Sequence, residues 1–595
     1  MSDYRYPLND ITFSLQHIAG FSRLNALRSE EVSDDLVDAI LNEAGKLCEQ
    51  VIAPINHSGD QEGSQIIAGE VHQAKGFKEA FSAYVEGGWG ALSGAEEYGG
   101  QGLPFALSAA VSEGVQAANL AFSLCPLLNQ GAIEAIETHG SEELKQTYLP
   151  KMISGEWVGS MNLTEPSAGS DLAAIQTKAI PEDDHYRLFG QKIFITWGDH
   201  QMTENIVHLV LARLPDAPEG VKGISLFIVP KFLLDASGNP SERNDVIPVS
   251  VEKKLGIHAS PTCVMSFGDN DGAIGYLVGQ ENRGLMAMFT MMNNARQGVG
   301  LQGLAISERA YQQALEYAQE RKQGMSADCT RKVEIIEHPD VLRMLMTMKS
   351  QIDAMRSLVY TAAVEIDLAN LADGEAKQLH NERNGIFTPI VKGWITEQAQ
   401  EITSLAVQVH GGVGFIEETG VAQHARDARI LPIYEGTNGI QSLDLIGRKL
   451  QGDQGEGIQR LLVDIENELS VIELDLVSDA STLLDNIKRV RAALVEVAEA
   501  QKVCLQRMND NPIDATGSAY SLMMLMGYTI GGWLQVRAQS KSISSDVLSD
   551  RQKASWNQSV DFYCQHILTR TYSYYQAIML GSESISSLSS SSFVR

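Results

Sequence analysis

One carboxylate, Glu435, lies in the glycine-containing stretch IYEGTNGIQ (433–441). Apolar side chains precede it at positions 430, 431, 433 and 434, and apolar surroundings raise the pKa of a carboxyl group and make it a better base. Gly436 and Gly439 allow backbone and ligand to approach closely. Taken alone, a glutamate is a solvated surface residue, because Glu is almost never buried unpaired. Glu435 is therefore a candidate general base whose role depends on the rest of the chain.

The stretch MNLTEPSAGSD (161–171) gathers hydroxyls, backbone N–H groups and a glycine in one loop. Such groups suit hydrogen bonding to the polar edge of a ring and to a phosphate. By itself the pattern is more typical of a turn that caps a helix.

The stretch QKIFITWGD (191–199) predicts a strand. Strand alternation places Phe194 and Thr196 on the same face, which would present an aromatic ring and a hydroxyl to a planar ligand. A half-buried strand of ordinary composition is the alternative.

Two glycine-containing stretches need separate interpretations. The glycines of QVHGGVGF (408–415) would allow the backbone to approach a neighbouring group closely. His410 on its own is more typical of a core histidine with its hydrogen bonds satisfied than of a ligand-binding residue. GVGLQG (298–303) matches GxGxxG, but residues 288–296 have helical spacing and no turn follows them. Without a strand and a turn the motif carries little weight, so we interpret it as small residues that let two helices approach.

The elements that position these stretches fall into segments of different texture. The fold class predicted is mainly α with a central antiparallel β domain and a C-terminal helical domain. The predicted segments are a helical domain (1–155), a β domain (156–275), a helical bundle (276–450), a polar linker (451–457), a second helical domain (458–580) and a disordered serine-rich tail (581–595).

Composition limits the class of protein. With 595 residues, 44% apolar and 20% charged, the chain is globular and has several domains. A net charge of -29 disfavours nucleic acid and anionic membranes. Six scattered cysteines without CxxC indicate neither a zinc site nor a disulfide framework. We see no signal peptide and no run of 18 apolar residues, so we expect a cytoplasmic protein without metal or membrane insertion.

The four stretches 161–171, 191–199, 408–415 and 433–441, in this order and spacing, resemble the signature of the flavin-dependent acyl-CoA dehydrogenases. The resemblance covers about residues 80 to 450 and implies that fold: helical domain, β domain and helical bundle. It implies FAD as cofactor and Glu435 as the catalytic base. The implied FAD contacts are Met161, Leu163, Thr164, Gly169, Ser170, Phe194, Ile195, Thr196, Arg321, Gln408, Gly411, Gly412, Thr437 and Gly439. The resemblance implies that the 408–415 segment lies on the adenine side of FAD. The implied acyl-CoA contacts are Ser170, Asn293, Arg296, Tyr434 and Gly436.

The chain departs from the family pattern at several positions. Phe194 replaces the usual Trp, and Asn438-Gly439 stands where many members have Ser-Gln. Arg321 resembles the Arg that binds the flavin pyrophosphate of a neighbouring subunit, but Gln323-Gly324 replaces the usual Thr-Phe-Gly and extra residues follow. Some members carry their base just before the Arg at 296; that position is Ala295 here, which leaves Glu435 without a rival.

The resemblance also implies partners and a substrate class. An acyl-CoA would be oxidised to the trans-2-enoyl-CoA, with electrons passing to an electron-transfer flavoprotein. The length and the helical extension are similar to long bacterial members that oxidise 3-methylmercaptopropionyl-CoA, and a fatty acyl-CoA of β-oxidation is the alternative substrate. By analogy a long form is a homodimer.

Three other functions stay open at this point. An oxidase of the same fold would pass electrons to oxygen. A non-catalytic relative that binds DNA would need a basic surface, whereas residues 458–580 are acidic. A membrane-associated long-chain enzyme fits poorly with the acidic, weakly amphipathic extension.

Overall fold

The structure is a computed structural model that describes residues 4–475, 481–545 and 548–593. These residues form two compact units. One comprises residues 1–42, 105–113 and 299–595, and the other comprises 43–104 and 114–298. We call them the bundle unit and the sheet unit.

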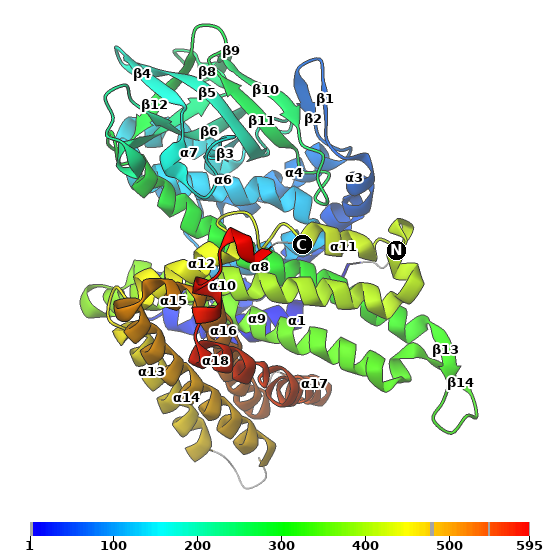
Figure 1. The fold of residues 1–595 in the computed structure, drawn as a ribbon. Helices are drawn as coiled ribbons and strands as arrows, with labels where there is room; N and C mark the ends of the chain where they lie inside the picture. The colour runs from blue at the N-terminus through cyan, green and yellow to red at the C-terminus, as the bar shows by residue number, and fades with distance from the viewer. Residues whose placement is uncertain (1–3, 476–480, 546–547, 594–595) are drawn as a thin grey trace. The chain divides into compact units, whose positions relative to one another are not determined.

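The sheet unit is built around one eight-stranded sheet (Figure 1). Its strands are β3 (Trp157–Asn162), β4 (Lys178–Glu182), β5 (His185–Thr196), β6 (Asn205–Arg213), β7 (Ile224–Pro230), β10 (Val246–Val251), β11 (Thr262–Phe267) and β12 (Ala273–Val278). The order is β10-β11-β5-β12-β7-β6-β3, with β4 beside β5 and β6. Pairing is antiparallel except that β3 and β4 each run parallel to β6. Strand β7, which is apolar except for Ser225, is buried on both faces.

Helices and two small hairpins complete the sheet unit. The helices are α2 (Asp34–Leu47) from residue 43, α3 (Asn56–Glu62), α4 (Phe77–Glu86), α5 (Phe105–Ala118) from residue 114, α6 (Leu120–His139), α7 (Glu142–Ser154) and the start of α8 (Gly284–Glu320). Helix α6 packs on β3. The contact is close at Gly159, where a Cβ would come within 2.3 Å of the Ala132 Cβ on α6. The hairpins are β1 (Gln65–Ile67) with β2 (Glu70–His72), and β8 (Phe232–Leu234) with β9 (Pro240–Arg243).

The first hairpin lies in the segment predicted to be mostly helical. Ala68 and Gly69 both have positive φ, as a two-residue hairpin turn requires. Ala-Gly is a weaker signal for that turn than Asn-Gly, which explains why the sequence did not reveal it.

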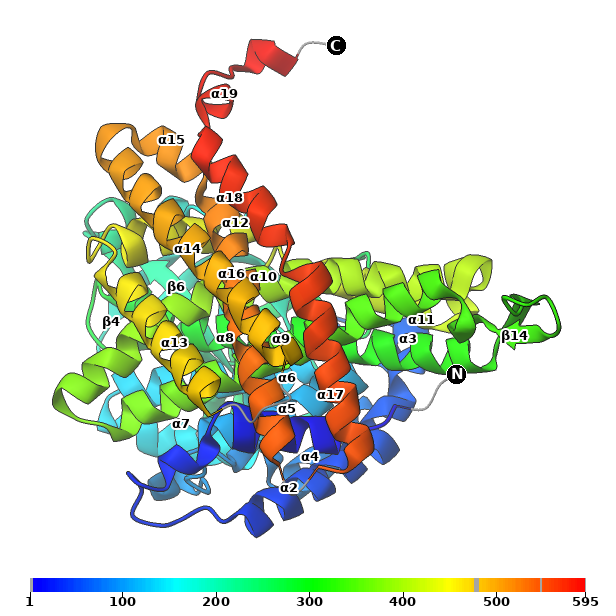
Figure 2. The ribbon, with the colours of Figure 1, turned by 90° about the horizontal axis from the view of Figure 1, so that it is seen from below.

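The bundle unit consists mainly of helices, several of them long. They are α1 (Leu8–Phe13), the parts of α2 and α5 up to residues 42 and 113, the rest of α8, α9 (Pro339–Leu371), α10 (Gly374–His410), α11 (Val421–Ala428), α12 (Asn438–Asp444), α13 (Glu456–Leu474), α14 (Ser481–Asp510), α15 (Pro512–Gly517), α16 (Ala519–Ser544), α17 (Asp550–Phe562), α18 (Arg570–Leu580) and α19 (Glu583–Ser586). Helices α13 to α19 form the C-terminal extension (Figure 2). The fold class predicted from the sequence is confirmed.

The GVGLQG stretch lies inside α8, without a strand or a turn. A Cβ at Gly300 would come within 2.3 Å of Val391 Cγ1, and one at Gly303 within 3.0 Å of Ile395 Cγ2. Both partners belong to α10, so the glycines do let two helices approach, as predicted.

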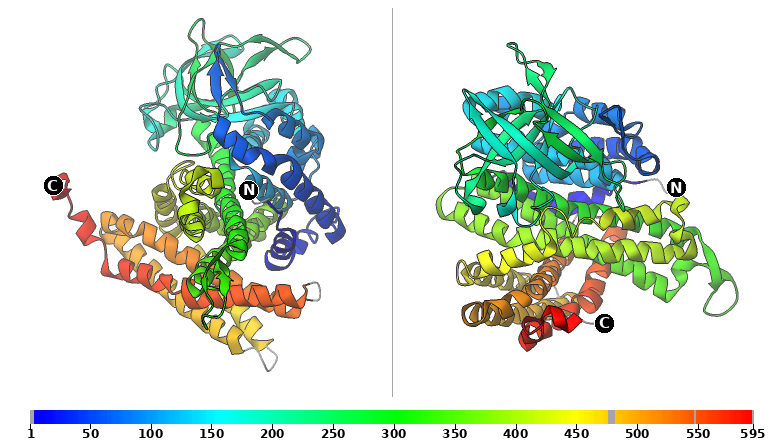
Figure 3. Two further views of the ribbon diagram at one scale, coloured as in Figure 1. Left: turned by 90° about the vertical axis from the view of Figure 1, so that its right-hand side faces the viewer. Right: turned by 45° about the horizontal axis from the view of Figure 1, so that its top comes forward.

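Two segments contain secondary structure that the sequence did not predict. The extra residues after Arg321 form a hairpin of β13 (Lys322–Met325) and β14 (Lys332–Glu334), which extends beyond the neighbouring helices (Figure 3). The tail predicted to be disordered contains α19, because Asp514 accepts the N–H of buried Ser582 at 2.5 Å and holds this end. Residues 594 and 595 lie outside the described residues.

Among the described residues, no helix combines the length and the apolar composition needed to cross a bilayer.

A buried charge cluster ties three helical segments of the bundle unit together. The Arg356 guanidinium, 1% exposed, donates to Glu113 at 2.7 and 2.9 Å and to Glu308 at 2.8 Å. The Tyr360 hydroxyl donates to the same Glu113 carboxylate. The burial of both signs of charge is tolerated because they are paired.

We predict that Arg356→Met lowers the free energy of unfolding by about 3–5 kcal/mol, because it leaves two buried carboxylates without their cation. Urea unfolding followed by circular dichroism measures the change. Arg460→Met, which removes an exposed pair with Glu382, serves as the control and should leave the midpoint in place. An equal midpoint for both variants would contradict the prediction.

Candidate active site

The sheet unit contains the loop TEPSAG (164–169), here called the TEPSAG loop, beside the end of β5. Ile193 N–H donates to Thr164 O at 2.9 Å, so the loop backbone runs next to β5. Glu165 and Ala168 exchange two backbone hydrogen bonds of 3.0 Å and close the tight turn between them. Ser170 is exposed, and nothing lies within 4 Å of a Cβ placed on Gly169.

A buried ion pair fixes this loop to the sheet. Lys192 of β5, fully buried, donates to Glu165 at 2.8 Å and to Leu163 O at 3.1 Å. Glu165 also accepts from Thr177 Oγ1 at 2.6 Å and from the N–H of Gln176 at 2.6 Å. The loop is therefore held by charge-assisted hydrogen bonds.

Burial and pairing act on both pKa values of this ion pair. Burial lowers the pKa of Lys192 to about 8, although the Glu165 carboxylate opposes the shift. Burial raises the pKa of Glu165, but the Lys192 ammonium and the hydrogen bonds outweigh it, and the net shift is downward. Both groups are thus charged at neutral pH.

The end of β5 carries a bulge at Phe194. Ile195 pairs with Cys263 and Lys192 with Met265, so two residues of β5 face Val264 alone. Phe194 has a φ of 60° and is 59% exposed. Ile195 is buried and Thr196 is half-buried. The bulge interrupts simple strand alternation at Phe194, and its strained backbone was not foreseen.

The other residues of the sheet unit that were predicted to bind FAD or acyl-CoA differ in how deeply their side chains are buried. Met161 and Leu163 pack against an apolar core, and the Ile195 side chain lies in a second one. Ile195 could therefore reach a ligand only through its backbone. On α8, buried Arg296 donates to exposed Asn293 at 3.3 Å.

In the bundle unit, Glu435 occupies a sharp turn between Tyr434 and α12. Glu435 has a φ of 54° and Gly436 a φ of 85°. Left-handed backbone at a non-glycine residue costs on the order of 1–3 kcal/mol and is concentrated at functional sites. Thr437 accepts the Ile440 N–H at 3.3 Å and caps α12.

The neighbours of Glu435 are firmly held. Burial and the Glu435 carboxylate raise the pKa of Tyr434, which stays neutral and donates to Gln302 at 2.5 Å. Gln441 Nε2 donates to Glu435 O at 3.5 Å and to Gly436 O at 3.3 Å. Gly439 is exposed.

The predicted adenine-side residues lie at the end of α10 and after α8. Helix α10 ends at His410, and Gly411 has a φ of 62°. His410 is buried, donates from Nδ1 to Ala406 O at 2.8 Å, and stacks on Tyr317, so it is a satisfied core histidine as predicted. Gln408, Gly411 and Gly412 are exposed, as is Arg321 beside the β13–β14 hairpin.

Sequence reasoning missed three residues that hold the site segments, namely Glu165, Lys192 and Asn438. The signal for the first two was a lysine on a strand that also carries Phe194 and Thr196, with an acid in the neighbouring motif. Asn438 was noted only as a departure from the family.

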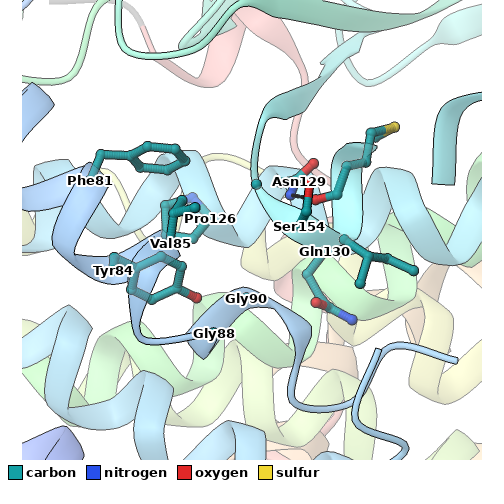
Figure 4. Close-up of a pocket in the computed structure, with 12 residues that line it drawn as sticks. Phe81, Tyr84, Val85, Gly88, Gly90, Pro126, Asn129, Gln130 and Ser154 are labelled. Atoms are coloured by element: carbon teal, nitrogen blue, oxygen red, sulfur yellow. Dashed lines mark hydrogen bonds between the residues drawn. The ribbon is translucent and has the colours of Figure 1, made fainter. Parts of the chain in front are cut away.

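The sheet unit also contains a pocket between α4, α6 and the end of α7 (Figure 4). It is lined by Phe81, Tyr84, Val85, Gly88, Gly90, Pro126, Asn129, Gln130, Met152, Ile153, Ser154 and Gly155. These lining residues include none of those predicted to bind FAD or acyl-CoA.

Four family models match the chain in order. They are "Acyl-CoA dehydrogenase, N-terminal domain" over residues 37–156, "Acyl-CoA dehydrogenase, middle domain" over 160–270, "Acyl-CoA dehydrogenase, C-terminal domain" over 282–451 and "Acetyl-CoA dehydrogenase C-terminal like" over 465–589. The last covers the helical extension.

Two curated relatives match nearly the whole chain. A 3-methylmercaptopropionyl-CoA dehydrogenase of Ruegeria pomeroyi is 46% identical over 537 residues, which cover 89% of this chain and 90% of that protein. A butyryl-CoA dehydrogenase of Syntrophomonas wolfei is 35% identical over 558 residues, 88% of this chain and 91% of that protein. The chain therefore belongs to the acyl-CoA dehydrogenase family, whose members are FAD-dependent oxidoreductases.

Two solved structures share the fold over most of this chain. Caenorhabditis elegans ACDH-11 in complex with C11-CoA has a TM-score of 0.77 at 20% identity and covers 94% of this chain and 91% of its own. An acyl-CoA dehydrogenase of Bacillus anthracis complexed with FAD has a TM-score of 0.75 at 22% identity and covers 93% and 89%. The resemblance drawn from the sequence is confirmed.

We predict that Lys192→Met lowers the free energy of unfolding by about 3–5 kcal/mol, since buried Glu165 loses its cation. The double variant Lys192→Met/Glu165→Gln should recover part of this loss, because the neutral amide is cheaper to bury. Urea unfolding of the three proteins measures both effects. A double variant that is less stable than Lys192→Met would show that the pair does not hold the loop.

Proposed function

We propose that this chain oxidises an acyl-CoA to its trans-2-enoyl-CoA, with FAD as cofactor and Glu435 as general base. The observation that supports this role for Glu435 is its left-handed backbone in a turn held by Gln441 and by the cap of α12. A strained, fixed carboxylate is what proton abstraction from a weak carbon acid needs.

The sheet unit has groups that fit a flavin. The exposed Phe194 ring offers an apolar surface, and Thr164 and Thr196 offer hydroxyls on adjacent backbone segments. Exposed Ser170 and Gly169 leave loop N–H and hydroxyl groups for a phosphate. We assign the other FAD contacts to Met161, Leu163, Ile195, Arg321, Gln408, Gly411, Gly412, Thr437 and Gly439.

The chemistry assigned to the protein is a proton transfer. The α-proton of a thioester is weakly acidic, so its removal needs a positioned base and hydrogen bonds to the thioester oxygen. The Glu435 carboxylate takes the α-proton, and its backbone N–H donates to the thioester oxygen. FAD, when bound, supplies the oxidising capacity by accepting the β-hydrogen as hydride. Ser170, Asn293, Arg296, Tyr434 and Gly436 bind the acyl-CoA.

We propose 3-methylmercaptopropionyl-CoA as the substrate. The support is 46% identity, over nine-tenths of both chains, to a dehydrogenase named for that thioester. The alternative is a short fatty acyl-CoA, supported by the 35% identical butyryl-CoA dehydrogenase.

We also propose that an electron-transfer flavoprotein accepts the electrons. We further propose that the chain forms a homodimer and that it is located in the cytoplasm. Val413, Phe415 and Ile416 are 43%, 87% and 49% exposed directly after the predicted adenine-side glycines. An apolar loop of this kind supports a subunit contact. Six free cysteines agree with a reducing compartment.

We predict that anaerobic addition of 3-methylmercaptopropionyl-CoA bleaches the bound flavin faster than butyryl-CoA or longer acyl-CoAs. Glu435→Gln should keep its flavin and lose about 10²–10⁴-fold in bleaching rate, as loss of a general base does. Stopped-flow absorbance at the flavin maximum measures both. Bleaching of the variant at the wild-type rate would exclude Glu435 as the base, and peroxide release in air exceeding reduction of a flavoprotein acceptor would favour an oxidase.

We predict that FAD retention falls as the pH rises through about 8. The pKa of Lys192 is lowered to about 8, so its ammonium is present below this pH and is lost above it. Loss of the charge weakens the hydrogen bonds to Glu165 and Leu163 O that hold the TEPSAG loop, which we propose contacts the flavin. Free flavin fluorescence after ultrafiltration measures retention. Lys192→Met is the control and should show no step near pH 8; a wild-type curve parallel to that of the variant would contradict the prediction.

A further inference from the structure

We propose that Asn438 is a positioning residue for Glu435, and that the C-terminal helical extension supports the loop that carries this base. The inference rests on the proposed role of Glu435 as general base. It assigns a purpose to residue 438, where the chain departs from the family pattern, and to the extension after residue 457.

The Asn438 side chain ties the Glu435 loop to one turn of α10. It is 4% exposed. Its Nδ2 donates to Glu397 Oε1 at 2.8 Å and to Gly393 O at 3.2 Å. Its Oδ1 accepts from the fully buried Lys392 ammonium at 2.9 Å, and Thr396 Oγ1 lies within hydrogen-bond distance of both ends of the amide.

The backbone of Asn438 closes the same loop. Its N–H donates to Pro432 O at 3.0 Å, which joins the two ends of the segment that contains Glu435. Its carbonyl oxygen accepts from Ser442 Oγ at 2.8 Å. The loop is thus closed by backbone bonds, and the Asn438 amide is its connection to α10.

Helix α16 of the extension packs against that turn of α10 (Figure 2). Trp394 is fully buried. A Cβ at Gly527 would lie 2.3 Å from Trp394 Cγ, and one at Gly531 would lie 3.3 Å from Trp394 Cη2. Two glycines on one face of α16 therefore make the surface on which Trp394 rests, and Met523 fills the space beside Gly393.

A hydrogen-bonded chain connects the extension to Asn438. Ser442 Oγ donates to Asn438 O at 2.8 Å and lies within hydrogen-bond distance, 3.4 Å, of Met523 Sδ on α16. Tyr528 of α16 donates to Gln398 at 2.9 Å. The turn of α10 that holds the Glu435 loop is accordingly held by the extension through both packing and hydrogen bonds.

The test compares full-length variants as FAD-loaded proteins. We expect Asn438→Ala to lower the rate of anaerobic flavin reduction at saturating acyl-CoA by on the order of 10-fold to 100-fold, since a misplaced reactive group costs this much. Flavin content should stay unchanged, and the pH profile of the reduction rate should shift because the base has a new environment. Asn438→Ser keeps one donor and one acceptor and should recover most of the rate.

Asn486→Ala is the matched control. Asn486 is equally buried and donates to Gln539 at 3.0 Å and Asp561 at 2.6 Å, but it lies on α14 and contacts neither α10 nor the loop by these bonds. We expect it to lose stability without a change in the reduction rate or its pH profile.

The role of the extension is tested by Tyr528→Phe. Loss of its 2.9 Å hydrogen bond to Gln398 on α10 should lower the reduction rate by about two- to tenfold. Combined with Asn438→Ala it should have no further effect, because Tyr528 acts through the turn of α10 that Asn438 contacts. Tyr575→Phe, which removes a 2.5 Å hydroxyl bond to Glu499 within the extension, should leave the rate unchanged.

The outcomes test the positioning role of Asn438 separately from the supporting role of the extension. If wild-type protein is bleached but Asn438→Ala reduces its flavin at the wild-type rate, or slows only as much as Asn486→Ala, the positioning role is wrong. If the effects of Tyr528→Phe and Asn438→Ala simply multiply, the extension does not act through Asn438. If no acyl-CoA bleaches the wild-type protein, the proposed function itself fails, and this inference fails with it.

Discussion

A buried lysine ammonium has to be hydrogen-bonded, and in both units this constraint fixes a loop of the candidate site. Lys192 and Lys392 are each fully buried. The first donates to Glu165 and Leu163 O at the TEPSAG loop, and the second donates to Asn438 beside the Glu435 turn. An ammonium withdrawn from water is costly unless its partners stay in place, so each lysine makes movement of its loop expensive. Long loops are otherwise the mobile parts of a fold.

Both loops are held in strained conformations. Among the described residues, nine non-glycine residues have positive φ, and Phe194 and Glu435 are two of them. Such backbone persists only where the surroundings determine it. The bulge of β5 and the cap of α12 supply these surroundings. Strain and rigid support therefore occur together at the two residues expected to lie closest to the chemistry.

The sequence predicted the fold class and the identity of the site segments, but not the means by which they are held. Helical periodicity and four ordered motifs are local signals, and they sufficed for the long helices and for the β domain. The GVGLQG stretch could be rejected as a nucleotide motif because its flanks are helical. The bulge at Phe194 and the contacts of Asn438 depend on partners far away in the chain, such as Val264 and Lys392. No local pattern reveals such pairs.

The close seating of Trp394 on Gly527 and Gly531 has a consequence for how the extension can evolve. A bulkier residue at either glycine would need a smaller one at 394, so the bundle helix and the extension must change together. Transplanting the extension from a distant homologue should therefore fail unless position 394 is exchanged with it. A lineage that acquired this contact could not easily lose the extra helices, because their loss would expose the Trp394 indole to solvent.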